Sequence, residues 1–157
     1  MLLTPPHNPW NRPCKLADTS LERLESDWKT GPYAALLCCH EVLPAMRARG
    51  EGTLLFTGAS ASLRGSARFG SFAGAKMSLR GLAQSLAKEE GPGGIHVAHV
   101  VVDAMVDMPV IHRFVPDAPK GRMLDTASAA EVYWQLHQQN KQCFTFEVDT
   151  RPYEASW

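Results

Sequence analysis

The sequence predicts a parallel α/β domain, on two observations. Three short runs of mainly apolar residues, at 53–58, 95–102 and 143–148, have the length of buried strands. Segments with the spacing of helices separate them, one at 69–90 and another that begins near Ser128. Strands that alternate with helices are joined by crossover connections, so we expect a parallel sheet with helices on its faces.

The segment before the first strand is expected to hold an arm and two helices. Residues 1–15 contain four prolines and no periodicity, which predicts an irregular arm. Thr19 followed by Glu22 is a capping-box pattern and predicts a short helix. A second helix is expected over about 32–48, ending at Gly50.

Glycine and capping residues mark the ends of the later elements. Gly52 and Gly58 bound the first strand, and the long helix is expected to stop at the run Gly91-Pro92-Gly93-Gly94. The run 95–102 is the richest in β-branched residues and predicts the second strand. Ser128-Ala129-Ala130-Glu131 repeats the capping-box pattern and predicts the start of the last helix.

The composition excludes several classes of protein. At 157 residues, with 45% hydrophobic and 20% charged residues, the chain fits one globular domain, which we place at 16–157. The 16 basic and 16 acidic residues cancel, which argues against a nucleic-acid partner. No apolar run reaches the roughly 18 residues of a membrane span. Four cysteines without a CxxC spacing, and no signal peptide, favour reduced thiols and a cytoplasmic location.

Two adjoining stretches carry the strongest functional signal: Thr57-Gly58-Ala59-Ser60-Ala61-Ser62-Leu63-Arg64-Gly65 and Phe69-Gly70-Ser71-Phe72-Ala73-Gly74-Ala75-Lys76. Together they resemble the active-site segment of the short-chain dehydrogenases/reductases (SDRs). In that family the segment ends in Tyr-x-x-x-Lys on a helix. The tyrosine passes a proton, and the lysine lowers the pKa of the tyrosine and holds the cofactor ribose. Here the lysine is Lys76, but the tyrosine position holds Phe72, which has no exchangeable proton.

The catalytic serine of the family is also displaced. Counting back from Phe72 by the usual serine-to-tyrosine spacing reaches Ala59. Ser60 is one place further on and Ser62 is three places further on. Either hydroxyl could reach a substrate if the loop is reshaped, or could only bond the loop backbone. We take Lys76, Ser60 and the degenerate position Phe72 as the catalytic set that the resemblance implies.

The resemblance also assigns cofactor contacts. It implies that Lys76 holds a ribose, and it places Asp103 at the start of the segment where the family usually has Pro-Gly-x-x-x-Thr. The threonine that contacts the nicotinamide corresponds to Met108, and the helix asparagine that fixes a relay water corresponds to Gly31. NAD(P) is therefore the cofactor implied by family resemblance, and no metal is expected.

The order of elements matches only the second half of an SDR. A dinucleotide-binding sheet has a Gly-rich turn after its first strand, and no G-x-G-x-x-G or G-x-x-x-G-x-G lies near the start of this sequence. At roughly 30 residues per βαβ unit, on the order of 90 residues are absent. We expect the C-terminal part of a Rossmann-like, doubly wound parallel sheet with the nucleotide-binding half missing, one strand edge unpaired, and NAD(P) not bound by this chain alone.

Three functions fit this pattern. The first is an SDR remnant, inactive by itself, whose ancestral activity is NAD(P)-linked oxidation or reduction of an alcohol or carbonyl. The second is a non-catalytic partner that associates with itself or with a full-length SDR through the helices at 32–48 and 69–90, which form the dimer interface in the family. The third is part of a longer, active NAD(P)-dependent enzyme that uses an acid other than tyrosine.

Other motifs are weaker. Ser60, Asp103 and His137 follow the chain order of a hydrolase triad, but no helix follows Ser60 directly, as a nucleophile elbow requires. His96 and His99 are three apart in a strand, so they face opposite sides and do not chelate one metal. Three arginines are expected to be solvated, with a pocket-lining role as the alternative for the first: Arg64, Arg68 and Arg80.

Overall fold

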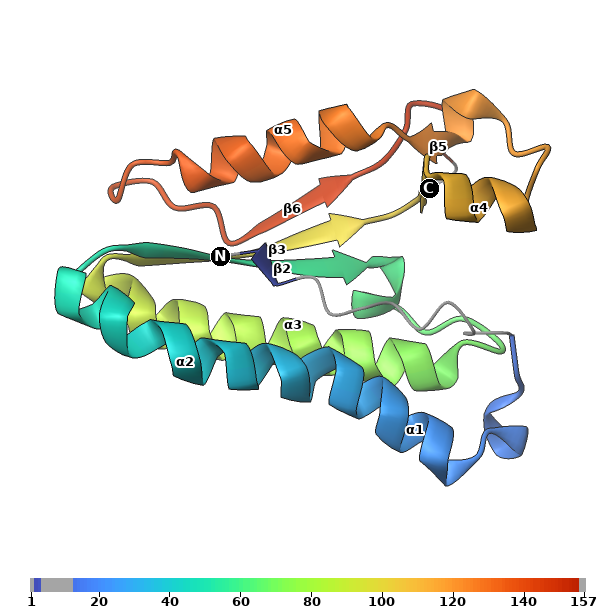
Figure 1. The fold of residues 1–157 in the computed structure, drawn as a ribbon, viewed down its shortest axis with the longest axis horizontal. Helices are drawn as coiled ribbons and strands as arrows, with labels where there is room; N and C mark the ends of the chain where they lie inside the picture. The colour runs from blue at the N-terminus through green and yellow to red at the C-terminus, as the bar shows by residue number, and fades with distance from the viewer. Residues whose placement is uncertain (1, 4–12, 156–157) are drawn as a thin grey trace.

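The computed structural model describes residues 2–3 and 13–155 of the chain. Their parallel sheet has the order β1-β2-β3-β6 and lies between two layers of helices, with α1, α2 and α3 on one face and α5 on the other (Figure 1). The parallel α/β architecture predicted from the sequence is therefore confirmed. The sheet strands are β1 (Leu2–Leu3), β2 (Gly52–Ala59), β3 (Ile95–Val102) and β6 (Glu147–Thr150). The helices are α1 (Leu21–Trp28), α2 (Ala34–Arg49), α3 (Gly70–Glu90), α4 (Pro109–Phe114) and α5 (Thr126–His137).

The register aligns the carboxyl ends of the three main strands. β2 and β3 pair along their whole length, so that Ala59 lies beside Val102. β6 pairs with the second half of β3, and its last residue, Thr150, also lies beside Val102. Because parallel strands end at the same edge of a sheet, the loops that leave β2 and β3 are brought together there. This edge is where open α/β sheets bind their ligands.

The predicted arm contributes a strand to the sheet. Leu2–Leu3 pairs in parallel with Leu55 and Phe56 of β2. The prediction that 1–15 is irregular is therefore wrong at these two residues, and so is the expectation of an unpaired edge along this part of β2. Residues 4–12 of the arm lie outside the described residues. An apolar strand edge is a template for any extended segment, and two residues are too few to produce a periodic signal in the sequence.

The two predicted N-terminal helices are joined into one bent helix. Between α1 and α2, residues Lys29–Tyr33 form a π-helical turn. Gly31 has φ −98° and ψ −106°, outside the helical region, and Pro32 supplies no N–H to the hydrogen-bond ladder. These two residues place the kink. The end of α2 agrees with the prediction, because Gly50 caps it in the left-handed conformation at φ 67°.

Both predicted capping boxes are displaced. Ser20, not Thr19, caps α1: its Oγ accepts a hydrogen bond from the backbone N–H of Arg23 at 3.2 Å. Asp125 caps α5, and its carboxylate accepts from the backbone N–H of Ser128 at 2.7 Å. In each case the observed cap and the predicted one lie within three positions of each other, both are good capping residues, and the local pattern does not rank one above the other.

The region after β3 differs most from the sequence prediction. The segment expected to be a strand at 143–148 becomes one only at Glu147. Before that, Phe144 stacks on the ring of His96 with centroids 4.3 Å apart, and Thr145 bonds Gln139 through its backbone N–H at 2.7 Å. Because of these contacts, Phe144 and Thr145 pack against His96 and Gln139 and do not belong to the strand. The sequence also did not predict α4, or the small parallel pair of β4 (Met105–Val106) and β5 (Met123–Leu124).

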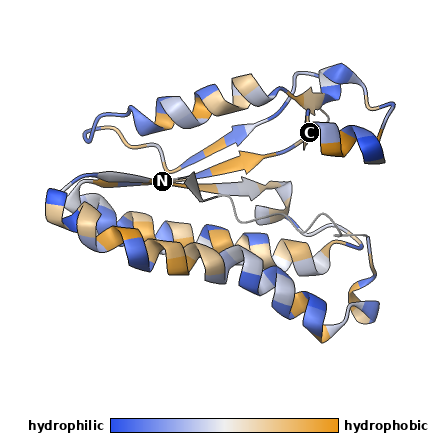
Figure 2. Cartoon of the chain, in the orientation of Figure 1, coloured by the Kyte–Doolittle hydropathy of each residue, from blue (hydrophilic) through white to orange (hydrophobic). Residues whose placement is uncertain are grey.

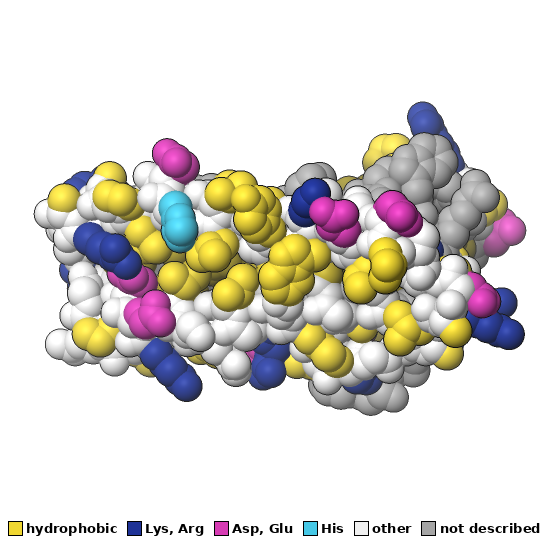
Figure 3. All heavy atoms as spheres, turned by 90° about the horizontal axis from the view of Figure 1, so that it is seen from below, with side chains coloured by type: hydrophobic (Ala, Val, Ile, Leu, Met, Phe, Trp, Pro, Cys, Tyr) yellow, Lys and Arg dark blue, Asp and Glu magenta, His cyan; other side chains and the backbone are white. Residues whose placement is uncertain are grey.

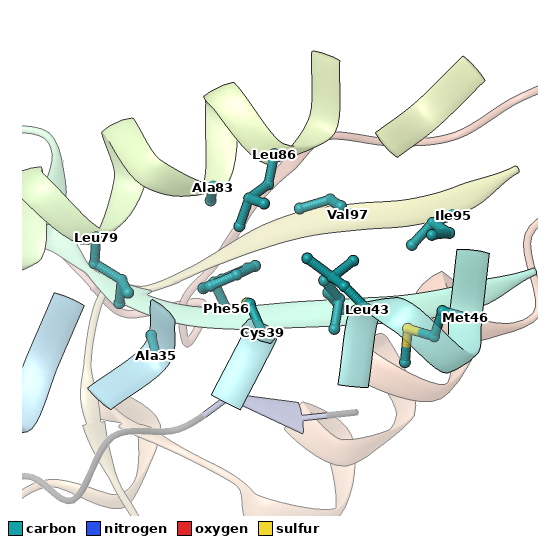
Figure 4. Packing of buried hydrophobic residues seen from close by; sticks show 11 residues of the cluster. Ala35, Cys39, Leu43, Met46, Phe56, Leu79, Ala83, Leu86, Ile95 and Val97 are labelled. Carbon is teal, nitrogen blue, oxygen red and sulfur yellow. The ribbon is translucent and has the colours of Figure 1, made fainter. Parts of the chain in front are cut away.

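The main core lies between the sheet and the α2–α3 layer. Phe56 of β2 and Val97 of β3 lie in one cluster with Cys39 of α2 and Leu86 of α3, and Leu86 lies beside Val97 (Figure 4). All four side chains are buried. Colouring by hydropathy shows β3 as an apolar strand, with apolar residues spread along α2 and α3 (Figure 2). None of the helices in the described part of the chain is long and apolar enough to cross a bilayer.

Candidate active site

A pocket of 430 Å³ opens at the carboxyl ends of β2 and β3. Its walls come from the end of β2, from the first turns of α3 and from the segment that follows β3. The pocket is lined by all five site residues that were predicted from the sequence: Ser60, Phe72, Lys76, Asp103 and Met108. The fold thus brings together residues that are far apart in the chain. Their roles stay predictions.

Lys76 is half-buried at this pocket, and its amine contacts a backbone carbonyl and no acid of the described residues. Its Nζ donates a hydrogen bond to the backbone carbonyl of Thr57 at 2.9 Å. Among residues 2–3 and 13–155, no carboxylate lies within ion-pair distance of that nitrogen. Burial penalises the ammonium form and lowers the pKa of Lys76 to about 8. A substantial fraction of this amine is therefore neutral near pH 8.

Phe72 lies one helical turn before Lys76 on α3, as the spacing predicts, and both side chains line the pocket. The Nζ of Lys76 is 5.8 Å from the centroid of the Phe72 ring. The ring therefore offers the ammonium form its π face, which is a weak attraction at this distance. It offers no phenolic proton for transfer to a substrate.

The two candidate serines have different environments. Ser60 begins a 3₁₀ turn (Ser60–Ser62) after β2 and lines the pocket together with Ala59. Ser62 is buried, and its Oγ accepts a hydrogen bond from the backbone N–H of Ala59 at 3.2 Å. The hydroxyl at the pocket is therefore that of Ser60, and Ser62 bonds the loop backbone.

Asp103 follows β3 directly, and two arginines hold its carboxylate. The Nη2 atoms of Arg64 and Arg151 both lie 3.2 Å from its Oδ2. Arg64 is thus paired with the carboxylate and is not among the residues that line this pocket. Met108 lies at the outer part of the wall, 37% exposed, just before α4.

Sequence reasoning missed a charged network beside the pocket. Arg80, which was expected to be solvated, makes two hydrogen bonds to the Glu147 carboxylate, from Nε at 2.6 Å and from Nη2 at 2.9 Å. The same carboxylate lies 2.9 Å from Nδ1 of His99. The hydrogen bond from Arg80 is the main cause that lowers the pKa of Glu147, and burial lowers the pKa of His99. His99 is therefore neutral, and its Nδ1–H donates to an ionised Glu147.

The other nitrogen of His99 has no hydrogen-bond partner among the described residues. This Nε2 is fully buried and lies against the backbone of Gly58, in the floor of the pocket. Glu147 orients the imidazole from one side, and Gly58 leaves room for it on the other because it has no side chain. The three residues of the network lie on α3, β3 and β6, and no local sequence pattern indicates that they meet.

The weaker motifs do not assemble. His137 bonds the Thr53 hydroxyl at 3.0 Å, at the start of β2, so it lies at the opposite end of the strand from Ser60 and Asp103. This separation rules out the hydrolase triad. His96 binds the Thr145 carbonyl through Nε2 at 2.8 Å, apart from the surroundings of His99. In the described part of the chain, no three His, Cys, Asp or Glu residues are grouped to hold a metal ion.

The parallel sheet, with a lysine-containing pocket at the carboxyl ends of two neighbouring strands, defines a Rossmann-like α/β domain. A profile of the short chain dehydrogenase family matches residues 11–116, more than half of the sequence. The chain therefore belongs to the short-chain dehydrogenase/reductase family.

Solved structures agree with this assignment. A short-chain dehydrogenase from Rhodopseudomonas palustris is 36% identical, with a TM-score of 0.77 over 97% of this chain. An alcohol dehydrogenase from Thermococcus sibiricus, complexed with 5-hydroxy-NADP, shares the fold at 19% identity and a TM-score of 0.77 over 91% of the chain. So does a serine dehydrogenase complexed with NADP+, at 16% identity and a TM-score of 0.80 over 91% of the chain. The matched region spans only 61%, 59% and 61% of these three proteins.

Proposed function

We propose that this chain carries the substrate-side pocket of an SDR but does not by itself catalyse NAD(P)-linked oxidation or reduction of an alcohol or carbonyl. The observation that carries the proposal is Phe72, which lines the pocket one turn before Lys76 where the family has its proton-transferring tyrosine. Proton transfer by a positioned group contributes roughly 10²- to 10⁴-fold to a rate. We place this protein in the cytoplasm.

Neither Asp103 nor Ser60 replaces the phenol. Asp103 is held by two arginines, and the Ser60 hydroxyl ordinarily keeps its proton near neutral pH. Lys76 is the one titratable group of the pocket that can exchange a proton near pH 8. The sequence has no Gly-rich dinucleotide turn near its start, so we expect this chain to bind the pyrophosphate of a dinucleotide only weakly.

This proposal predicts that the purified chain neither binds nor oxidises NADPH. The measurements are quenching of tryptophan fluorescence by NADPH and loss of NADPH absorbance in the presence of small aldehydes and ketones. Phe72→Tyr, alone or with Ala59→Ser, is expected to leave both results unchanged because the cofactor site is incomplete. Saturable binding at low micromolar NADPH, or turnover by Phe72→Tyr, would show that the proposal is wrong.

A second candidate function is part of a longer, active enzyme. It is favoured by the match to the Rhodopseudomonas palustris dehydrogenase, which extends over nearly all of this chain but only 61% of that protein. Sequencing the transcript upstream of Met1 tests it. An open frame that encodes a strand, a Gly-rich turn and a helix would support this function, and Lys76 would then be the first residue to test as the replacement acid.

A third candidate function is association with a second copy of this chain. The alternative partner is a full-length SDR. Several large apolar side chains are exposed on the side of the molecule formed by α1, α2 and α3 (Figure 3). We call this side the α1–α3 face. It carries a groove of 480 Å³ between α1 and α3. Its exposed members are Leu21, Leu24, Trp28, Tyr33, Leu37 and Met77. A contiguous apolar surface of this kind is typical of an interaction site.

Light scattering after size-exclusion chromatography tests the association. We expect a mass above the 17.3 kDa monomer and a shift toward the monomer in Trp28→Glu, because a carboxylate in an apolar interface is costly. Trp134→Glu is the matched control, since Trp134 is exposed to a similar degree (53% against 48%) but lies on α5, across the sheet. A wild-type monomer, or equal effects of the two substitutions, would contradict association through the α1–α3 face.

A further inference from the structure

We propose that Lys76 is a covalent attachment site for small apolar aldehydes, which the pocket captures as an imine. This goes beyond the proposed function because it needs neither NAD(P)H nor a proton-transferring tyrosine. Three observations carry it: the position of the amine inside a ligand-sized pocket, the absence of an acidic partner for that amine in the described structure, and the apolar lining around it.

The surroundings of Nζ favour a nucleophilic amine. Its hydrogen bond to the Thr57 carbonyl uses one N–H and leaves the nitrogen lone pair of the neutral form unused. Asp103, the acid among the residues that line the pocket, is paired with Arg64 and Arg151, so it does not hold the ammonium form. His99, which interacts electrostatically with Lys76, is bound to Glu147, and Arg80 is bound to the same carboxylate. Burial then lowers the pKa of Lys76, as it does in lysines that form Schiff bases.

The pocket matches a small apolar ligand. Its volume of 430 Å³ is within the range of small-molecule sites, about 300–1,000 Å³. Apolar side chains make up most of the wall: Ala59, Phe72, Val102, Ala104, Met105, Val106, Met108 and Ile111. Phenylalanine in place of tyrosine removes a phenol that would otherwise be an acidic neighbour of the lysine. An aromatic or short aliphatic aldehyde therefore fits this lining better than a charged one.

The reaction balances without an oxidant or reductant. The lone pair of neutral Lys76 attacks the aldehyde carbon, a C–N bond forms, and a proton moves from nitrogen to the alkoxide oxygen to give a carbinolamine. The hydroxyl then takes a proton from solvent and leaves as water, which breaks the C–O bond. The second N–H proton is returned to solvent, and the C=N bond forms. The products are one imine and one water for each aldehyde consumed.

Benzaldehyde with sodium cyanoborohydride tests the proposal on the whole chain. The reductant converts the imine into a stable benzyl-amine, which peptide mass mapping assigns to a lysine. The other five lysines are exposed and serve as internal references: Lys15, Lys29, Lys88, Lys120 and Lys141. At pH 8 an amine with a pKa of about 8 has a neutral fraction roughly a hundredfold above that of an ordinary lysine at 10.5. Its lower basicity reduces nucleophilicity, so we expect Lys76 to be labelled about tenfold faster than these references.

Two controls separate pocket capture from simple amine reactivity. Benzyl alcohol, which has the same ring but forms no imine, is expected to slow labelling of Lys76 and to leave Lys88, an exposed residue of the same helix, unaffected. Lys76→Arg should abolish the fast label, and Lys88→Arg should keep it. Labelling of Lys76 no faster than that of Lys88 in the wild type would overturn the proposal, and this comparison needs no variant to fold. Equal protection of both lysines by benzyl alcohol would also overturn it.

Discussion

Gly58→Ala is expected to destabilise the domain by about 2–3 kcal/mol, as overpacking of a rigid core does. A Cβ at this position would overlap Nε2 of His99 and lie 2.9 Å from Oγ of Ser62. The imidazole does not move aside easily because its Nδ1 is tied to Glu147, which two hydrogen bonds from Arg80 also hold. Chemical denaturation followed by circular dichroism measures the loss.

Gly81→Ala is the matched control for Gly58→Ala. Gly81 lies on α3, and a Cβ there would meet nothing within 4 Å. Alanine has the better helix propensity, so this substitution should stabilise the protein by about 0.5–1 kcal/mol. In a His99→Ala background the ring is gone, and Gly58→Ala should then cost less than it does in the wild type. Such coupling identifies His99 as the obstacle. Wild-type stability of Gly58→Ala would contradict the account of the pocket floor.

The second large effect concerns Lys76 and pH. Burial lowers the pKa of Lys76 from 10.5 to about 8, so between these values the unfolded chain holds a proton that the folded chain has lost. Stability rises with pH where the unfolded state binds more protons. The contribution of Lys76 to the free energy of unfolding is therefore most unfavourable below pH 8. It becomes less unfavourable from pH 8 to 10.5 and is constant above pH 10.5. Relative to Lys76→Met, the wild type should gain up to about 3 kcal/mol across this window.

The quantity to compare is the difference in the free energy of unfolding between the wild type and Lys76→Met at each pH. Burial also raises the pKa of Cys39 to about 11, which lowers stability with rising pH above about 9 in both proteins and cancels in the difference. Denaturant melts at several pH values between 7 and 10.5 measure it. Lys88→Met, at an exposed position of the same helix, should show no such pH-dependent difference from the wild type. A constant difference between wild type and Lys76→Met would mean that the amine is not buried in solution.

Local sequence patterns predicted the main elements and five of the residues that line the pocket. An apolar run bounded by glycines predicted β2, a run rich in β-branched residues predicted β3, and Gly50 marked the end of α2, because strand burial and helix termination depend on neighbouring residues. The four-residue spacing of Phe72 and Lys76 put them on one face of α3, since a helix repeats every 3.6 residues. Both lie in the pocket for that reason.

Which distant side chains meet depends on the tertiary structure. Glu147 is 48 residues from His99 and 67 from Arg80, yet all three are joined because β6 pairs with β3 and α3 packs across them. Hydrophobic periodicity sets which face of an element is buried, but it does not choose the partner of a charged group. The same holds for Arg64, which forms an ion pair with Asp103, and for Leu2–Leu3, which pairs with β2 at the edge of the sheet. These contacts form between elements, so their energies depend on packing that no local pattern of residues encodes.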